Sequence, residues 1–82
     1  MRLYISLDSI LREPDIPVIE MFIEYYKRKM GSGQEVPAVE VWEDGKGYRI
    51  IDGFHRVEAA RRLGWTEMAA IVCALGESEF WS

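Results

Sequence analysis

Alternating apolar and polar positions predict a β-strand at the start of the chain. Every second residue of segment 2–7 is apolar, which gives a strand one apolar side and one polar side. A single helical turn is expected next, because Asp8 and Ser9 are both residue types that commonly cap a helix.

The longest apolar stripe predicts a helix from Ile16 to Met30. Its apolar residues recur every three or four positions, which is the spacing of one helix face. The stripe consists of Val18, Met21, Phe22 and Tyr25, widened by Ile19, Ile23 and Tyr26. Asp15 is the predicted N-cap, and glycines from Gly31 onward end the helix. We expect the stripe to face the protein core rather than to form a ligand-binding surface.

Two further alternating segments predict a β-hairpin in the middle of the chain. They cover residues 38–42 and 48–52, and the pair Asp44-Gly45 lies between them. This dipeptide is a strong signal for a tight hairpin turn. Residues 48–52 are therefore expected to run antiparallel to residues 38–42.

A second helix and a last strand complete the predicted fold. Helical spacing runs from His55 to Leu63 and ends at Gly64, a favoured residue after a helix. Residues 68–74 are almost all apolar, which predicts a strand buried on both faces. The predicted class is α+β, with a small mixed β-sheet of about four strands and two main helices.

The length of 82 residues predicts one domain with one core. The core is expected within residues 2–74, followed by an acidic tail, 75–82, that carries Phe80 and Trp81. One cysteine allows no internal disulfide, and Asp8 interrupts the N-terminal apolar run, which argues against a signal peptide. No apolar run approaches membrane-spanning length, so we expect a cytoplasmic protein.

The charge is unevenly distributed along the chain. Its net charge is −4, but the segment from Gly45 to Gly64 holds five basic and two acidic residues and is +3, which leaves −7 for the rest. An acidic protein with one basic segment suits a small anion better than a long nucleic acid. On charge alone, a solvent-exposed helix face rich in arginine explains the segment equally well.

The sequence Asp52-Gly53-Phe54-His55-Arg56 lies where the predicted strand ends and the helix begins. Backbone N–H groups at a helix N-terminus lack intrahelical acceptors, and the helix dipole is positive there, so the position attracts anions. Gly53 lets a phosphate approach the backbone closely. We therefore predict a phosphate- or nucleotide-binding site at Gly53, Phe54, His55 and Arg56, called here the 53–56 turn.

The side chains of this turn have two interpretations. Arg56 is expected to face outward and grip a phosphate with its forked guanidinium, while His55 donates a hydrogen bond beside it. Replacing Arg56 by alanine should then weaken ligand binding and leave the fold stable. One alternative is a plain capped turn, in which Asp52 is the N-cap, Gly53 makes the bend, and His55 and Arg56 lie on the surface. Another alternative is that Arg56 is a structural clamp paired with Asp52.

The run IIDGFHRVEAARRLGW resembles the ParB/sulfiredoxin superfamily, and in particular ParB-like N-terminal domains with a DGxHR motif. Pro37, Val39 and Val41 before the run and residues 68–72 after it strengthen the resemblance. It extends over residues 4–74. The resemblance implies the ParB/sulfiredoxin fold, an α+β domain.

The resemblance also implies that nucleotide phosphates bind at the 53–56 turn. Partition proteins bind CTP there, sulfiredoxins bind ATP, and free-serine kinases use ATP or ADP. By resemblance, Gly53, His55 and Arg56 would contact phosphate. Sulfiredoxins carry a catalytic cysteine where this chain has Phe54, and Cys73 is expected to be buried and inert. The reductase reaction of sulfiredoxins is therefore not expected.

Kinase-like members of the superfamily use acidic residues to activate a hydroxyl group and to hold Mg²⁺. The resemblance points to Asp52, beside the turn, and to Glu13, in the loop after the first strand, as candidate catalytic residues. A carboxylate can accept the hydroxyl proton while the metal neutralises phosphate charge. No set of protein metal ligands is predicted, and both acids also fit simple roles as an N-cap and a loop charge.

The sequence supports three functional hypotheses and leaves open whether the protein is an enzyme. The preferred one is a module, regulatory or adaptor, that binds a nucleotide, ATP or CTP, or a similar phosphate ligand. The second is a nucleotide-dependent phosphotransferase acting on a small hydroxyl compound. The third is a DNA-associated accessory protein, which reaches DNA only through a partner or an oligomer. This third role requires one continuous basic face, formed by Lys46, Arg49, Arg56, Arg61 and Arg62. A homo-oligomer is compatible with the sequence.

Overall fold

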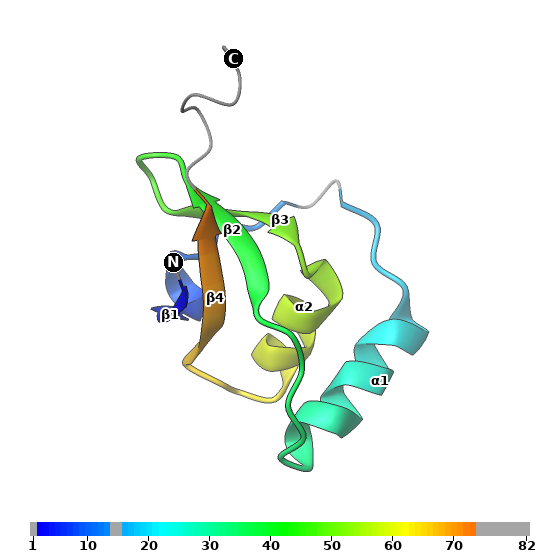
Figure 1. Cartoon of the computed structure of the whole chain (residues 1–82). Helices are drawn as coiled ribbons and strands as arrows, with labels where there is room; N and C mark the ends of the chain where they lie inside the picture. The colour runs from blue at the N-terminus through cyan, green and yellow to red at the C-terminus, as the bar shows by residue number, and fades with distance from the viewer. Residues whose placement is uncertain (1, 14–15, 74–82) are drawn as a thin grey trace, which may run out of the picture.

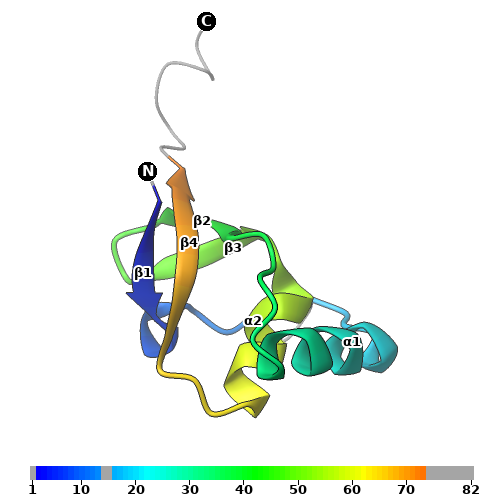
Figure 2. The ribbon, with the colours of Figure 1, turned by 60° about the horizontal axis from the view of Figure 1, so that its bottom comes forward.

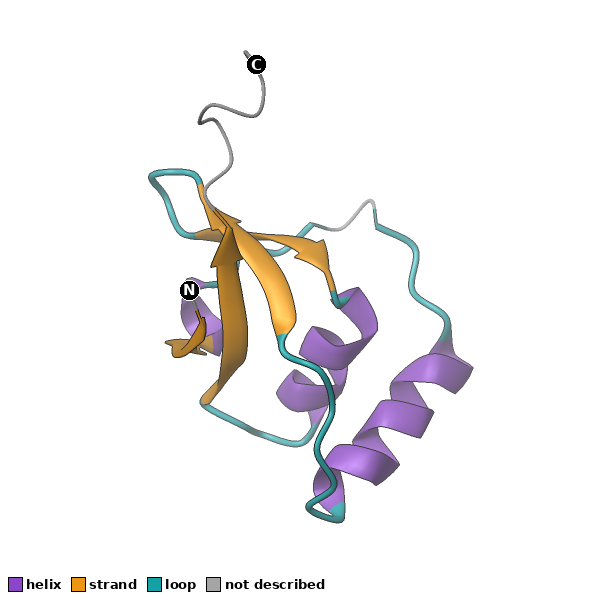
Figure 3. Cartoon of the chain, viewed as in Figure 1, coloured by secondary structure: helices purple, strands orange, loops and turns teal. Residues whose placement is uncertain are grey.

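In the computed structural model, which describes residues 2–13 and 16–73, the strands form one mixed sheet (Figure 3). The sheet has the order β1-β4-β2-β3. Its strands are β1 (Arg2–Ser6), β2 (Val39–Glu43), β3 (Tyr48–Asp52) and β4 (Glu67–Cys73). β1 pairs antiparallel with β4 and β2 antiparallel with β3, whereas β2 and β4 run parallel. The predicted α+β class and mixed sheet are confirmed.

Two helices lie on the same side of the sheet, one outside the other (Figure 1, Figure 2). α2 (Phe54–Arg62) lies next to the sheet, and α1 (Glu20–Gly31) packs against α2. A short 3₁₀ turn, η1 (Leu7–Ser9), follows β1. After β3 the chain runs through α2 and returns to the sheet on the far side of β2, so β4 pairs with β2 and not with β3.

The core lies between the sheet and α2, and α1 closes one side of it. Val39 and Val41 of β2 and Val57 of α2 are fully buried, and α1 adds Ile23 and Met30. The remaining core residues are Ile5, Leu7, Ile10, Ala59, Ala60, Met68 and Ala70. Because β2 lies between β3 and β4, its inward side chains are covered from all sides, and it anchors everything that packs on it.

The predicted hairpin between β2 and β3 is confirmed. The backbone N–H of Asp44 donates to the carbonyl of Gly47 at 3.1 Å, and the Asp44 side chain accepts from the backbone N–H of Lys46 at 2.8 Å. Arg49 donates from Nε to the same carboxylate at 2.7 Å. The Lys46 hydrogen bond, followed by the Arg49 guanidinium, lowers the pKa of Asp44.

Helix α1 begins at Glu20, so the predicted start at Ile16 is wrong. The preceding Ile19 has an extended backbone, with φ −106° and ψ 117°, and no side chain caps the helix. Its N–H donates to Nε2 of His55 at 3.0 Å, from the other helix. This long-range hydrogen bond holds the chain in an extended form where the local spacing favoured a helix. The predicted N-cap, Asp15, lies outside the described residues.

The apolar stripe faces the core only in part, so the prediction that it is core is wrong for most of its residues. Met21, Phe22 and Tyr25 keep 69, 42 and 51% of their surface exposed. Ile23 is fully buried and Tyr26 is partly buried against the core, and Met30 is buried with them. The reason is that α1 packs against α2 rather than the sheet, so only one side of it is covered.

Strand β4 is buried on one face rather than on both. Met68 and Ala70 point to the core, whereas Glu67 and Ile71 are exposed. Both helices cover the same face of the sheet, which leaves the other face of β4 open (Figure 2). Cys73 is half-buried rather than buried.

The ends of the second helix are close to those predicted. α2 begins and ends one residue earlier than the predicted range from His55 to Leu63. Gly64 follows it with φ +80°, and Trp65 donates its N–H to the carbonyl of Ala60 at 3.0 Å, as in a glycine-terminated helix. The predicted tail, 75–82, lies outside the described residues. Within the described ranges, no helix is long and apolar enough to cross a membrane.

Candidate functional site

Gly53 makes the sharp turn from β3 into α2. It is the N-cap residue, with φ +119° and ψ 26°, a conformation that other residues rarely adopt. A side chain would not fit there, because a Cβ atom would lie 2.6 Å from Cγ1 of Val39. The prediction that Asp52 is the N-cap is wrong, since Asp52 belongs to β3 and pairs with Glu40.

The N-terminus of α2 presents three backbone N–H groups without acceptors. The first helical hydrogen bond runs from the N–H of Val57 to the carbonyl of Gly53, at 2.9 Å. Among the described residues, none accepts from the N–H groups of Phe54, His55 or Arg56. No side chain caps this end, and its first turn contains no acidic residue. The dipole and the three donors together favour an anion at this position.

These donors border an open hollow of about 200 Å³, called here the turn hollow. It is lined by Tyr26, Asp52, Gly53, Phe54, His55 and Arg56. The structure thus brings the four residues of the 53–56 turn together with one of the two candidate acids. Tyr26 comes from α1 and was not predicted to take part, because its helical spacing assigned it to the core.

The prediction that Arg56 faces outward is wrong, because only 8% of its surface is exposed. Its Nη1 group donates to the backbone carbonyls of Pro37 and Ala38, the second at 3.3 Å. Its Nη2 group lies 3.3 Å from a carboxylate oxygen of Asp52. Arg56 therefore clamps α2 to the chain just before β2, while its positive charge still borders the turn hollow.

His55 joins the two helices at the edge of the turn. Because its Nε2 atom accepts from Ile19, that nitrogen carries no proton, and we assign the ring proton to Nδ1. No described residue accepts a hydrogen bond from Nδ1. Its ring also meets Phe22 edge to face, with centroids 5.4 Å apart. His55 can thus donate to a ligand from Nδ1 while Nε2 holds the segment before α1.

The two candidate acids lie in different hollows. Asp52 borders the turn hollow, and its carboxylate is 73% exposed. Glu13 borders a smaller hollow next to Phe54, and its carboxylate pairs with Arg49 at 3.7 Å. Within the described residues, no three His, Cys, Asp or Glu side chains cluster as a metal site. Asp52 is therefore the acid that the fold brings to the turn.

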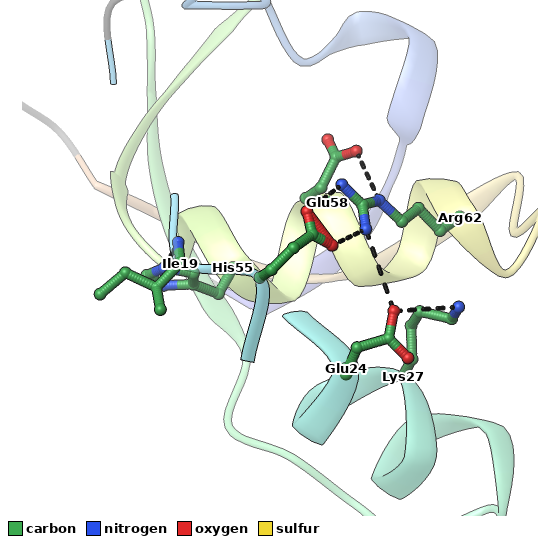
Figure 4. A network of polar contacts seen from close by, with 7 residues as sticks. Ile19, Glu24, Lys27, His55, Glu58 and Arg62 are labelled. Atoms are coloured by element: carbon green, nitrogen blue, oxygen red, sulfur yellow. Dashed lines mark hydrogen bonds and ion pairs between the residues drawn. The ribbon is translucent and has the colours of Figure 1, made fainter. Parts of the chain in front are cut away.

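The four arginines of the predicted basic face are each held by acceptors of the chain itself. Arg61 donates to the carbonyl of Ile10 at 2.9 Å, and burial lowers its pKa. Arg62 lies between the acidic residues of α1 and Glu58 of α2, and the hydrogen bonds to Glu20 and Glu58 raise its pKa (Figure 4). Arg49 and Arg56 pair with Asp44 and Asp52. These ion pairs with Asp44, Asp52, Glu20 and Glu58 reduce the positive charge that the predicted basic face would offer to DNA.

Cys73 lies far from the turn along the sheet. It pairs with Trp42, near the end of β2, whereas Gly53 lies against Val39 at the start of β2. Cys73 is therefore not among the residues that line the turn hollow. That Cys73 is inert stays a prediction.

Comparison with known sequences gives one distant relative and no family profile. No protein-family profile matches the chain. A curated protein of Streptomyces griseus, described as "Streptomycin biosynthesis operon possible regulatory protein", is 39% identical over 57 residues. The match covers 70% of this chain but only 16% of that protein.

Comparison with solved structures identifies the fold. Sulfiredoxin from Arabidopsis thaliana superposes with a TM-score of 0.78 at 19% identity, over 89% of this chain and 84% of that chain. The chain has a ParB/sulfiredoxin-like fold. The chromosome-partitioning protein ParB from Caulobacter crescentus, complexed with CTP-γ-S, and a free serine kinase in complex with AMP give the same TM-score and identity. They cover 94% of this chain, which spans 46% of the ParB chain and 32% of the kinase chain.

Proposed function

We propose that this ParB/sulfiredoxin-like domain binds a nucleotide through its phosphates at the 53–56 turn. The observation that carries the proposal is the uncapped start of α2, where the N–H groups of Phe54, His55 and Arg56 border the turn hollow. Anions bind favourably at such helix N-termini because several donors and the dipole act together. The Nδ1 proton of His55 and the nearby charge of Arg56 add to this attraction.

Proteins of the same fold support a nucleotide as the ligand. The ParB chain was solved with CTP-γ-S, and the free serine kinase was solved with AMP and with ADP. Since these proteins are only 19% identical to this chain, they support the ligand class and not the choice between ATP and CTP. The turn hollow is small, so the phosphates fill it and the rest of the nucleotide extends beyond it.

The role that we propose is that of a regulatory or adaptor module. The name of the Streptomyces griseus relative, a possible regulatory protein, supports this role. The only carboxylate among the described residues that line the turn hollow belongs to Asp52, and it is already paired with Arg56, which favours binding over catalysis. A nucleotide bound there would act by stabilising α1 and α2 in their present contact, because His55 touches both helices.

Nucleotide binding is tested by a thermal-shift titration. ATP or CTP at about one hundred times its dissociation constant should stabilise the domain by about 2.7 kcal/mol, a rise in melting temperature of roughly 10–20 °C. Adenosine and cytidine are the controls, because they lack phosphates, and each nucleotide is measured with and without Mg²⁺. The proposal is wrong if the nucleosides stabilise as strongly as the triphosphates, or if no triphosphate stabilises at all.

A second candidate function is phosphoryl transfer to a small hydroxyl compound, favoured by the exposed Asp52 carboxylate beside the turn. Mg²⁺ is usually held by one or two carboxylates together with substrate phosphates, and Asp52 is placed to reach such an ion. Asp52 would also accept the proton of the attacking hydroxyl group.

Asp52→Asn separates this second function from simple binding. If Asp52 is the general base, the variant should form ADP from ATP and free serine about 10²–10⁴-fold more slowly, while still binding ATP. Glu13→Gln is the matched variant and should change the rate less, because Glu13 lies in another hollow beside Arg49. A wild-type protein that binds ATP but forms no ADP excludes this function with serine.

A further inference from the structure

An aromatic hollow of about 500 Å³ lies beside the turn hollow. It is lined by Met21, Phe22, Tyr25 and Tyr26 of α1 and by His55 of α2. Its volume is within the range of roughly 300–1,000 Å³ that small-molecule sites occupy. Phe22 and Tyr25 each expose about half of their surface, and neighbouring exposed apolar side chains of this kind can mark a ligand-binding groove.

The rings of this hollow are held in defined positions. The ring of Phe22 meets that of His55 edge to face. The rings of Tyr25 and Tyr26 also meet edge to face, with centroids 5.2 Å apart and an angle of 76° between the ring planes. Lys29 donates to the Tyr25 hydroxyl at 3.3 Å. Edge-to-face contacts fix the rings without covering both of their faces. The exposed aromatic surface can therefore stack on a planar ligand.

The aromatic hollow and the turn hollow are neighbours that share two lining residues. Tyr26 and His55 line both of them, so one ligand can touch both at once. Figure 4 shows His55 beside Ile19, the residue just before α1. The turn hollow offers donors for an anion, and the aromatic hollow offers apolar rings. A nucleotide has the matching pair of ends, an anionic phosphate chain and a planar base.

We infer that the base of the bound nucleotide lies in the aromatic hollow and stacks on Phe22 and Tyr25. This inference rests on the proposed function, because it places the second half of the same ligand. A second copy of the chain or a protein segment could also cover exposed rings, but neither would account for the two residues shared with the turn hollow. The exposed part of the stripe, which was predicted to be core, is on this account a binding surface.

The test compares a nucleotide with a ligand that has phosphates and no base. Binding of ATP, CTP and inorganic triphosphate is measured by calorimetry on the wild type, Phe22→Leu and Tyr25→Leu. Leucine keeps an apolar side chain but removes the ring, so each variant should bind its preferred nucleotide roughly 5- to 100-fold more weakly. Binding of inorganic triphosphate should not change. Tyr4→Leu is the matched control, since Tyr4 is an exposed tyrosine on β1 outside the hollow.

Each outcome separates this inference from the proposed function. If triphosphate and nucleotide bind equally well and neither variant changes nucleotide affinity, the base site is wrong while phosphate binding stands. If the wild type binds neither ligand, the proposed function fails and the base site fails with it. If the variants instead abolish self-association in sedimentation and leave nucleotide affinity intact, the aromatic hollow is an interface between copies. Melting temperatures without ligand confirm that each variant is folded.

Discussion

Gly53→Ala is expected to destabilise the domain by about 2–5 kcal/mol. The backbone at Gly53 has φ +119°, which a residue with a side chain adopts only under strain. The new Cβ atom would also lie 2.6 Å from Cγ1 and 2.8 Å from Cβ of Val39. Val39 is fully buried and branched at Cβ, so it cannot move aside by changing rotamer. The melting temperature should fall by roughly 10–30 °C in a domain of this size.

Gly64→Ala provides the control for the strained backbone alone. Gly64 also has a positive φ, of +80°, but nothing lies within 4 Å of an added Cβ atom. Gly64→Ala should therefore lose only the free energy of placing alanine at a positive φ, about 1–2 kcal/mol, with no steric overlap added. Equal losses in the two variants, measured by urea unfolding, would contradict the close packing of the 53–56 turn on β2.

Arg56→Ala is expected to destabilise the domain by about 1–3 kcal/mol, because it removes a buried side chain together with its three hydrogen bonds. The guanidinium donates to the carbonyls of Pro37 and Ala38 and pairs with Asp52. Alanine would remove these donors and leave a hole where the Arg56 side chain packs. Lysine cannot replace the fork, so Arg56→Lys should restore little of the loss.

Arg28→Ala is the matched control for Arg56→Ala. Arg28 is an exposed arginine in the last turn of α1, and its removal should change the free energy of unfolding by less than about 0.5 kcal/mol. A stable Arg56→Ala variant would support the outward, ligand-gripping arginine that the sequence predicted. Nucleotide affinity is best measured at a temperature where Arg56→Ala remains folded, so that a loss of affinity is not confused with a loss of stability.

The features that depend on local sequence were predictable. The Asp44-Gly45 turn, strand β3 and the end of α2 at Gly64 all carry their signals within a few residues. The glycine at the start of α2 is another local signal, because a sharp turn from strand to helix requires it. These signals were enough to predict the mixed sheet and the position of the 53–56 turn.

The features that depend on distant partners could not be predicted. Arg56 is bound to carbonyls 18 and 19 residues earlier in the chain, which no helical periodicity reveals. The start of α1 is decided by His55, which lies 36 residues from Ile19. Helical spacing predicted that α1 has an apolar face, but only the packing of α1 on α2 determines which face is covered.

The central claim is that a phosphate group binds the backbone at the start of α2. Nitrogen–proton correlation NMR of the wild-type domain, titrated with inorganic triphosphate, observes those donors directly. The proposal predicts that the amide signals of Phe54, His55 and Arg56 shift together, with their protons moving downfield, and saturate at one dissociation constant. Unchanged signals for these three amides at saturating triphosphate, whether or not other signals move, would contradict the claim.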